Sequence, residues 1–222
     1  MRALVCREFG PPEALEVGEL PEPEAEADEV LIQVEAAAAS FADSLMIRDL
    51  HQNKHTLPFA PGMEVAGEII GLGKDVSGLK IGDRVMALVY DGGYAERAVA
   101  PATETFRIPD SMEAGTAAAM CASYLTSHGA LVWQARTEPG ERVLVLGAAG
   151  GVGLAAVEIA KALGATVIAA ASTPEKLSLA AAHGADHGIN YSEGDLREQV
   201  LGLTDGNGCL LYTSDAADEH TG

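Results

Sequence analysis

The stretch Arg142-Val-Leu-Val-Leu-Gly-Ala-Ala-Gly-Gly-Val-Gly-Leu154 decides the fold of this chain. It starts with Val143 to Leu146, an apolar run rich in β-branched residues and too short for a helix, which is typical of a buried parallel strand. A glycine turn follows, and the residues from Leu154 to Leu163 then have the apolar spacing of a helix. Strand, glycine turn and helix in this order predict a dinucleotide-binding site.

We expect the glycine turn and the start of the helix to hold the pyrophosphate of the dinucleotide. Glycines at 150 and 153 let the backbone approach the phosphates and let the helix pack closely on the strand. The helix N-terminus offers N–H groups and the positive end of its dipole. The residues predicted to contact the cofactor here are Ala149, Gly150, Gly151, Val152 and Gly153. The alternative is an ordinary glycine-rich turn without a ligand, which the flanking strand and helix disfavour.

Strands and helices alternate after this stretch. The expected order is a strand at 166–170, a helix at 174–183, a strand at 187–191 and a helix at 195–203. This alternation predicts a parallel, doubly wound sheet. Residues 209–212 could form a fourth strand, but the polar residues after them do not continue the pattern. Because a dinucleotide fold is normally built from two such halves, we expect one half here and an uncovered edge on its sheet.

The residues before Pro109 favour β structure instead. Strands are expected at 3–6, 15–20, 29–35, 63–72, 83–89 and 94–100, with turns rich in glycine and proline between them. A short helix is expected at 40–48, N-capped by Ser40. Many short strands of this kind predict a compact β-barrel-like domain. After Pro109 the composition becomes helical over 114–122 and 125–133.

Composition and charge narrow the possible partners. The chain of 222 residues is 48% hydrophobic and carries a net charge of −19, and it is long enough for two modest domains. Nucleic acid and anionic membranes both attract basic patches, so we expect neither as a partner. No apolar run reaches the roughly 20 residues of a membrane span. The separated cysteines Cys6, Cys121 and Cys209 form no disulfide or zinc pattern, which favours a reduced, cytoplasmic setting.

Four motifs carry a resemblance to a known family. They are Pro61-Gly-Met-Glu-Val-Ala-Gly67, Gly82-Asp-Arg-Val85, Gly92-Gly-Tyr-Ala-Glu96 and Val145-Leu-Gly-Ala-Ala-Gly-Gly-Val-Gly153. Their order over residues 1–208 is similar to that of the medium-chain dehydrogenase/reductases, and within this superfamily to the zinc-free NADPH:quinone oxidoreductases. The resemblance implies an α/β protein with a GroES-like β-barrel domain, a partial Rossmann domain, an active-site cleft between the two, and homodimers.

The resemblance also divides the chain. It implies a GroES-like substrate domain at 1–115, the first half of an NAD(P)-binding Rossmann domain at 116–208, and a tail at 209–222 that is unlike the family. Family members continue beyond this point. The sequence therefore predicts a C-terminally truncated or frame-shifted chain with impaired activity.

Zinc is not expected, although zinc alcohol dehydrogenases belong to the same superfamily. A catalytic zinc needs three ligands from Cys, His, Asp or Glu. The zinc relatives have a histidine where this chain has Met63, and a thioether is a poor Zn²⁺ ligand. Their cysteine falls near Ala39–Asp43, which contains none. We expect the loop histidines His51 and His55 to be solvated rather than to bind metal.

The end of the second strand favours NADPH over NADH. NAD sites place a carboxylate about 20 residues past the glycines, and this strand ends Ala169-Ala-Ala-Ser172 without one. Ser172 and Lys176 offer a hydroxyl and a cation to the 2′-phosphate of NADPH. The resemblance adds Tyr191, which would pack over the same group. For Lys176 the alternative is a solvated charge on the helix surface.

The substrate residues follow from the resemblance. The family motif Asn-Phe-x-Asp matches Ser40-Phe-Ala-Asp43, with a serine in place of the asparagine. The proton would come from water or from a polar group such as Asp43 or Ser40, Phe41 and Met63 would line an apolar pocket, and Thr126 would lie near the nicotinamide. A structural carboxylate at Asp43 and core packing at Thr126 remain alternatives.

These features together predict an NADPH-dependent oxidoreductase that transfers hydride to a quinone or another α,β-unsaturated carbonyl. The hydride chemistry itself belongs to the cofactor. An enoyl or alcohol-type reductase of the same superfamily is the runner-up. A non-catalytic NADPH-binding protein is the alternative from a different class.

Overall fold

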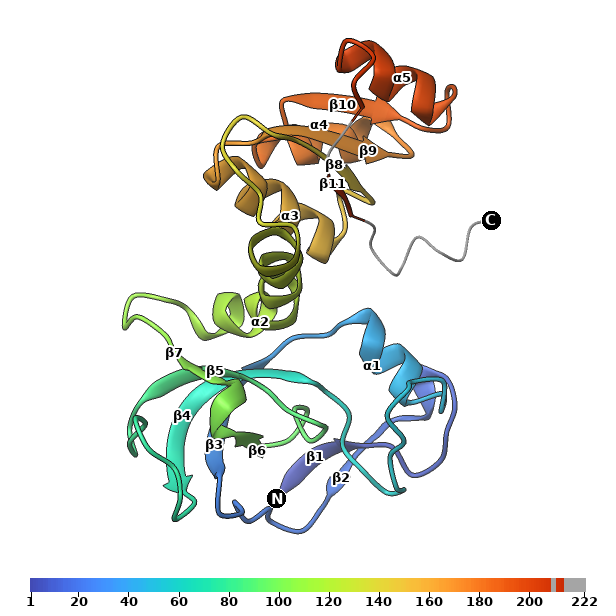
Figure 1. Cartoon of the computed structure of the whole chain (residues 1–222). Coiled ribbons are helices and arrows are strands. Elements are labelled where there is room, and N and C mark those ends of the chain that lie inside the picture. The colour runs from blue at the N-terminus through green and yellow to red at the C-terminus, as the bar shows by residue number, and fades with distance from the viewer. Residues whose placement is uncertain (209–210, 214–222) are drawn as a thin grey trace. The chain divides into compact units, whose positions relative to one another are not determined.

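The computed structural model describes residues 1–208 and 211–213. The chain divides into two units, the first at Met1–Ala122 and the second from Ser123 onward, and each is described by itself. Figure 1 shows the antiparallel strands of the first unit in blue to green and the alternating strands and helices of the second in yellow to red.

The first unit is built on a five-stranded antiparallel sheet in the order β6-β3-β4-β5-β7, with β1 and β2 as a separate antiparallel pair. Its strands are β1 (Arg2–Val5), β2 (Glu16–Glu19), β3 (Glu29–Ala37), β4 (Glu64–Leu72), β5 (Arg84–Leu88), β6 (Arg97–Pro101) and β7 (Thr105–Arg107). Its helical elements are α1 (Phe41–Met46), the N-terminal part of α2 (Ala114–His128) and two short 3-10 helices at Pro12–Ala14 and Ala102–Glu104.

One face of this sheet forms the core of the first unit. Val30 and Ile32 on β3 are fully buried, as are Val65 and Ile69 on β4 and Val85 on β5. Residues two or four apart on a strand share a face, so the alternation in the sequence places these side chains together. The expected β-barrel-like domain is confirmed. The structure adds β7, which the sequence did not predict, and shortens the expected strand at 94–100 to β6.

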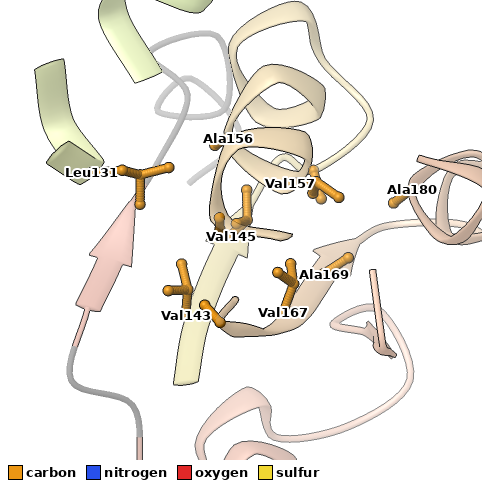
Figure 2. Close-up of a cluster of buried hydrophobic side chains, with 11 residues drawn as sticks. Leu131, Val143, Val145, Ala156, Val157, Val167, Ala169 and Ala180 are labelled. Atoms are coloured by element: carbon orange, nitrogen blue, oxygen red, sulfur yellow. The ribbon is translucent and has the colours of Figure 1, made fainter. Parts of the chain in front are cut away.

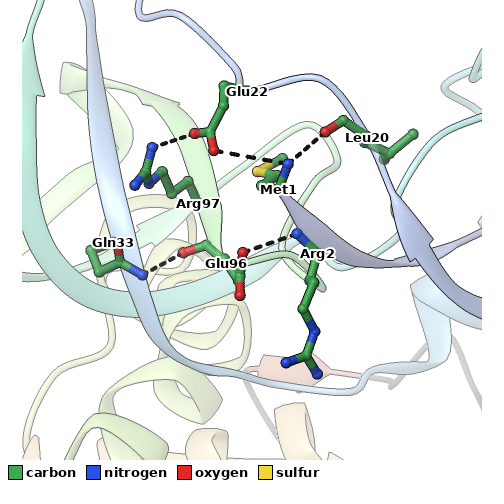
Figure 3. Close-up of polar contacts among 7 residues, drawn as sticks. All are labelled: Met1, Arg2, Leu20, Glu22, Gln33, Glu96 and Arg97. Carbon is green, nitrogen blue, oxygen red and sulfur yellow. Dashed lines mark hydrogen bonds and ion pairs between the residues drawn. The ribbon is translucent and has the colours of Figure 1, made fainter.

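Polar contacts tie the first strand to its neighbours, as Figure 3 shows. The Met1 ammonium donates to the Leu20 carbonyl at 2.8 Å and lies 3.8 Å from the Glu22 carboxylate, which also pairs with Arg97. Glu96 accepts a hydrogen bond from the backbone N–H of Arg2 and, through its carbonyl, one from Gln33. These bonds join the start of β1 to the chain around β6 and β3.

The second unit contains a four-stranded parallel sheet in the order β10-β9-β8-β11. Its strands are β8 (Arg142–Leu146), β9 (Thr166–Ala171), β10 (His187–Asn190) and β11 (Leu211–Thr213). Its helices are the C-terminal part of α2, a π-helical segment at Gly129–Gln134, α3 (Gly151–Ala162), α4 (Pro174–Ala182) and α5 (Leu196–Leu203). This confirms the expected α/β fold, in which an antiparallel β unit precedes a parallel sheet with alternating helices.

Both faces of the parallel sheet are covered. Val143, Val145 and Val167 are fully buried against Val157 of α3, as Figure 2 shows. Leu144 and its neighbours on the other face pack beneath α5. A strand buried on both sides has no polar alternation, which is why Val143 to Leu146 is continuously apolar. Each such side chain contributes about 1.5–3 kcal/mol through burial.

Two features differ from the expected pattern. Two helical segments were expected, at 114–122 and 125–133. The structure has one helix, α2, which runs through Ser123 and Tyr124 and is followed by the π-helical segment. The edge of β8 that was expected to be uncovered pairs in parallel with β11. The fourth strand suggested at 209–212 lies partly outside the described residues, and the strand in the structure is Leu211–Thr213.

Among the described helices, none has the length and hydropathy needed to cross a membrane.

Candidate functional site

The glycine turn lies between β8 and α3, as the sequence predicted. Gly150 is the N-cap of α3 in an extended conformation, and its N–H donates to the Gly147 carbonyl at 2.8 Å. The first N–H groups of a helix have no acceptor within the helix. The backbone from Gly151 to Gly153 therefore presents donors and the positive end of the α3 dipole, which is the arrangement that binds phosphate.

Gly153 allows α3 to pack directly on this turn. A Cβ at position 153 would lie 2.2 Å from the Gly147 carbonyl oxygen and 2.9 Å from the Ala148 Cα. These are backbone atoms that cannot move away without displacing the turn. The predicted role of the last glycine, close packing of helix on strand, has its physical basis in this contact.

Ser127 is a residue of the site that the sequence analysis missed. Its side chain is buried, and its hydroxyl donates to the Val152 carbonyl in the first turn of α3 at 2.8 Å. The neighbouring Thr126, which was predicted to lie near the nicotinamide, is exposed on α2. Its exposure is inconsistent with core packing, the alternative considered above. Its role at the cofactor stays a prediction.

The residues predicted to select the cofactor lie together at the end of β9. Lys176 Nζ donates to the Ser172 hydroxyl at 3.2 Å. Tyr191 follows β10, and its backbone N–H donates to the Ala171 carbonyl at 3.2 Å. Because the strands are parallel, these residues and the glycine turn share the carboxyl edge of the sheet, where ligands of such folds bind. The structure thus brings together the predicted cofactor residues after β8, β9 and β10.

A second polar cluster lies in the first unit, around Asp43. Ser40 is the N-cap of α1, and both its backbone N–H (2.6 Å) and its hydroxyl (3.0 Å) donate to Asp43 Oδ2. The Tyr94 hydroxyl donates to the same oxygen at 2.9 Å. The sequence pattern predicted the cap by Ser40. Tyr94 was missed as a site residue because 51 positions separate it from Asp43.

Glu64 is another buried carboxyl of this unit. Its Oε2 accepts a hydrogen bond from the Ala122 N–H at 2.8 Å. Burial raises the pKa of Glu64 above its ordinary value, and the charge of Asp43 adds to the effect. Burial also raises the pKa of the nearby Cys121 thiol to about 12, helped by Glu64. That thiol is therefore protonated at neutral pH and is not a nucleophile.

The two residues predicted to line the substrate pocket differ in exposure. Phe41 begins α1 and is 51% exposed. Met63 is partly buried and packs against Cys6, Met46 and Phe59. The predicted apolar pocket formed by Phe41 and Met63 stays a prediction.

His55 is not solvated, contrary to the expectation from the sequence. Its side chain is 2% exposed, stacks on Phe59 with ring centroids 4.9 Å apart, and pairs through Nδ1 with Asp91 at 2.9 Å. A loop position in the sequence gave no indication of this partner, which lies 36 residues away. His51 is only partly buried. Within residues 1–208 and 211–213, no group of three His, Cys, Asp or Glu side chains could hold a metal ion.

A cavity of about 570 Å³ also lies in the first unit. Phe59, Tyr90 and Asp91 contribute to its wall. None of the predicted site residues lines it. The predicted site residues therefore form two separate groups, the glycine turn in the second unit and the Asp43 cluster in the first.

Comparison with known proteins gives two family matches. Residues 26–110 match the alcohol dehydrogenase GroES-like domain, and residues 151–217 match the zinc-binding dehydrogenase family. Among curated proteins, the chain is 40% identical over 208 residues to quinone oxidoreductase-like protein 2 of Bos taurus, covering 93% of this chain. The chain spans 59% of the length of that relative.

Solved structures agree with these matches. A quinone oxidoreductase from Thermus thermophilus, also described in complex with NADPH, is 42% identical with a TM-score of 0.77, over 91% of this chain and 64% of that one. An NAD-dependent alcohol dehydrogenase is 33% identical with a TM-score of 0.86, over 94% of this chain and 69% of that one.

Proposed function

This chain belongs to the medium-chain dehydrogenase/reductase superfamily, among its quinone oxidoreductase-like members, and from that premise we propose that it binds NADPH for hydride transfer to a quinone or another α,β-unsaturated carbonyl. The observation that carries the proposal is the carboxyl edge of the parallel sheet. There the start of α3 and the Ser172–Lys176 pair share one edge.

The preference for NADPH is argued from charge. A 2′-phosphate carries negative charge and oxygen acceptors, which a lysine and a hydroxyl bind and a carboxylate repels. Lys176 supplies the ammonium group and Ser172 the hydroxyl. β9 ends in alanines rather than in an acidic residue. The relative from Thermus thermophilus, which is described in complex with NADPH, supports the same choice.

Different residues of the chain have separate proposed roles in cofactor binding and in proton transfer. When bound, the nicotinamide supplies the hydride. The N–H groups at the start of α3 hold the pyrophosphate, and Ser127 fixes the first turn of that helix through the Val152 carbonyl. In the first unit, Asp43 and Ser40 are the hydrogen-bonding groups that we propose to serve the proton transfer that completes the reduction.

We propose that the reaction needs no zinc. Position 63 is a methionine, whose thioether is a poor ligand for Zn²⁺, and the adjacent Glu64 is bonded to the Ala122 N–H. A metal centre built as in the zinc alcohol dehydrogenases would lack its imidazole here. Hydride transfer is then assisted by hydrogen bonds rather than by a Lewis acid.

The test is a titration of the full-length protein with NADPH and NADH, followed by turnover with a panel of quinones and enones. We expect NADPH to bind at least about tenfold more tightly than NADH, and quinones or enones to be reduced. Turnover of enoyl thioesters or simple aldehydes alone would favour the enoyl or alcohol-type reductase. Binding of NADPH without turnover of any acceptor would favour a non-catalytic NADPH-binding protein. Tighter binding of NADH would contradict the proposal.

A further inference from the structure

Only one of the two oxygen atoms of the Asp43 carboxylate accepts hydrogen bonds from the described part of the chain. Oδ2 accepts from the Ser40 N–H, from the Ser40 hydroxyl and from the Tyr94 hydroxyl, at 2.6, 3.0 and 2.9 Å. Oδ1 is buried and has no hydrogen-bond partner among the residues that the structure describes. A buried carboxylate oxygen without a donor is costly, so its retention requires an explanation such as a water, an ion or a catalytic role.

Tyr94 is held in place by its backbone on two sides. Its N–H donates to the Pro61 carbonyl at 2.9 Å, and its carbonyl accepts from the Leu4 N–H at 2.8 Å. A tyrosine fixed at both backbone groups has its hydroxyl direction determined by two side-chain torsions alone. The ring therefore reaches α1 from a rigid base.

Two glycines shape the space around this ring. Gly62 has a φ of +100°, and a Cβ there would lie 2.7 Å from the Tyr94 ring. A Cβ on Gly93 would lie 2.8 Å from the Gly62 carbonyl oxygen. The two motifs that contain these glycines thus pack against one another, and no side chain fits between the ring and the backbone that supports it.

The Tyr94 hydroxyl donates its hydrogen bond to Asp43 rather than to the Ala38 carbonyl. The hydroxyl oxygen lies 2.9 Å from Asp43 Oδ2 and 3.1 Å from the Ala38 carbonyl oxygen. A phenol has one proton to donate, and a charged acceptor forms the stronger bond. Burial raises the pKa of Tyr94, and the charge of Asp43 raises it further, so the donor stays protonated at any physiological pH. Glu64, the other acidic group that acts on Tyr94, has the same effect on its pKa.

We propose that Tyr94 is a positioning residue of the candidate site, which joins Ser40 on Oδ2 of Asp43 and so reserves Oδ1 for an O–H donor. The donor is either a water that takes part in the proton transfer or a hydroxyl of the reduced product. Because Oδ2 has two lone pairs and three donors, an incoming O–H group finds its acceptor at Oδ1. The assignment of the donor rests on the proposed reductase function, whereas the orientation of the carboxylate does not.

The first experiment tests the orientation without any turnover. Hydrogen exchange of the Ser40 amide is measured by NMR in the wild type, in Tyr94→Phe and in Tyr90→Phe. Tyr90 is a matched control, because it lies in the same loop region and its hydroxyl donates to the Lys54 carbonyl at 2.7 Å. We expect Ser40 to exchange about tenfold faster in Tyr94→Phe, since a carboxylate that can rotate releases this N–H. Tyr90→Phe and the amides of β3 and β4 should keep their rates.

An unchanged Ser40 rate in Tyr94→Phe would overturn the proposal. Faster exchange throughout β3 and β4 would also overturn it, because Tyr94 would then only stabilise the unit as a whole.

The second experiment uses turnover of the full-length protein in a double-mutant cycle. We expect Tyr94→Phe to lower kcat about tenfold with an unchanged KM for NADPH, and Asp43→Asn to lower kcat further. The double variant should be no slower than Asp43→Asn, because Tyr94 acts through that carboxylate. Losses that multiply in the double variant would show that Tyr94 acts independently and would overturn the proposal.

Two measurements on Asp43→Asn, hydroquinone binding and kcat, identify the O–H group that donates to Oδ1. Weaker binding of hydroquinone to Asp43→Asn than to the wild type would assign the donor to the product hydroxyl. Equal binding with a lowered kcat would assign it to water. Equal binding with an unchanged kcat would overturn the use of Oδ1. If the wild type reduces no quinone or enone, the proposed function fails, and the exchange experiment still decides the role of Tyr94.

Discussion

At the scale of single residues, glycine is irreplaceable at only some of its positions. At Gly153 a Cβ would meet backbone atoms of the turn at 2.2 Å, whereas at Gly202 in the last turn of α5 it would meet nothing within 4 Å. The same substitution should therefore have opposite effects at the two positions. Sequence motifs identify the first glycine, and only the structure separates it from the second.

We predict that Gly153→Ala destabilises the protein and Gly202→Ala stabilises it. At 153 the turn must move away from α3, which should lower the free energy of unfolding by more than about 2 kcal/mol and abolish NADPH binding. At 202, alanine has the better helix propensity and should add about 0.5–1 kcal/mol. Urea unfolding and an NADPH titration measure both effects. Equal stabilities of the two variants would contradict the packing described for α3.

The Ser172–Lys176 pair makes a prediction about cofactor affinity. We expect Lys176→Ala to weaken NADPH binding about 10–100-fold and to leave NADH binding within about twofold, because only NADPH carries the phosphate. Fluorescence titration with both nucleotides gives the two constants. Lys74→Ala, at an exposed lysine of the first unit, is the control and should change neither constant. A parallel loss for both nucleotides would mean that Lys176 does not contact the 2′-phosphate.

The side chains that the sequence could not place are those whose partners are remote in the chain. Ser40 could be assigned as a cap because its partner Asp43 is three residues away. His55 was expected to be solvated, and its partner Asp91 became visible only in the folded chain. Tyr94 is part of a recognised motif, but no local rule links it to Asp43. Local hydrogen bonds follow from the sequence pattern, whereas those that cross the fold depend on tertiary structure.

At the scale of elements, Glu158 joins three helices of the second unit. From α3 it accepts a hydrogen bond from the Tyr124 hydroxyl on α2, and its other oxygen lies 2.5 Å from Nδ1 of His183, which follows α4. The hydrogen bond from Tyr124, followed by that from His183, lowers the pKa of Glu158 below its ordinary value. The hydrogen bond to Glu158 is also the main reason that the pKa of Tyr124 is raised to about 12.

This arrangement predicts a pH dependence of stability. A carboxyl whose pKa is lowered by folding stabilises the protein above its unfolded pKa of about 4.3, and loses that contribution as the pH falls through the lower folded value. At pH 7, Glu158→Gln should therefore cost about 0.5–1 kcal/mol, a figure kept small by the partial exposure of the pair. The difference from the wild type should shrink below about pH 4. Urea denaturation from pH 3 to 7 measures it, and a constant difference over that range would contradict the role of the charged form.

Elements with strong local signals were predicted well. Val143 to Leu146, the helix that follows and the alternation after it match β8, α3, β9, α4, β10 and α5. β7 has three residues and too short a pattern to be recognised. α2 continues through Ser123 and Tyr124, whose helix propensity is only moderate, so propensity alone does not predict where this helix ends.

At the scale of the whole molecule, the two units follow different construction rules. An antiparallel sheet with one buried face forms the first, and a parallel sheet buried on both faces forms the second. The change of apolar period near Pro109 marks the transition in the sequence, and the contacts place the division after Ala122. The domain bounds 1–115 and 116–208 stay predictions, as does the assignment of 209–222, most of which lies outside the described residues.

The proposed absence of zinc is testable on the intact protein. If no residue group holds a metal, treatment with EDTA should change the Tm by less than about 1 °C and leave NADPH affinity unchanged, because structural metals contribute directly to folding free energy. Thermal unfolding and elemental analysis before and after dialysis give the result. A fall in Tm on chelation that zinc alone reverses would show a metal site that the described residues do not reveal.

The register of β8 against β9 has a practical consequence for protein engineering. Leu146 pairs with Ala170, so the turn proposed to hold the coenzyme and the segment proposed to discriminate between coenzymes follow two neighbouring strands. If Ser172 and Lys176 select the coenzyme as proposed, exchanging them for an acidic and a neutral residue should shift the preference toward NADH and leave the turn after β8 unchanged. On that assignment, the coenzyme preference could be changed at the end of β9 without redesigning the rest of the sheet.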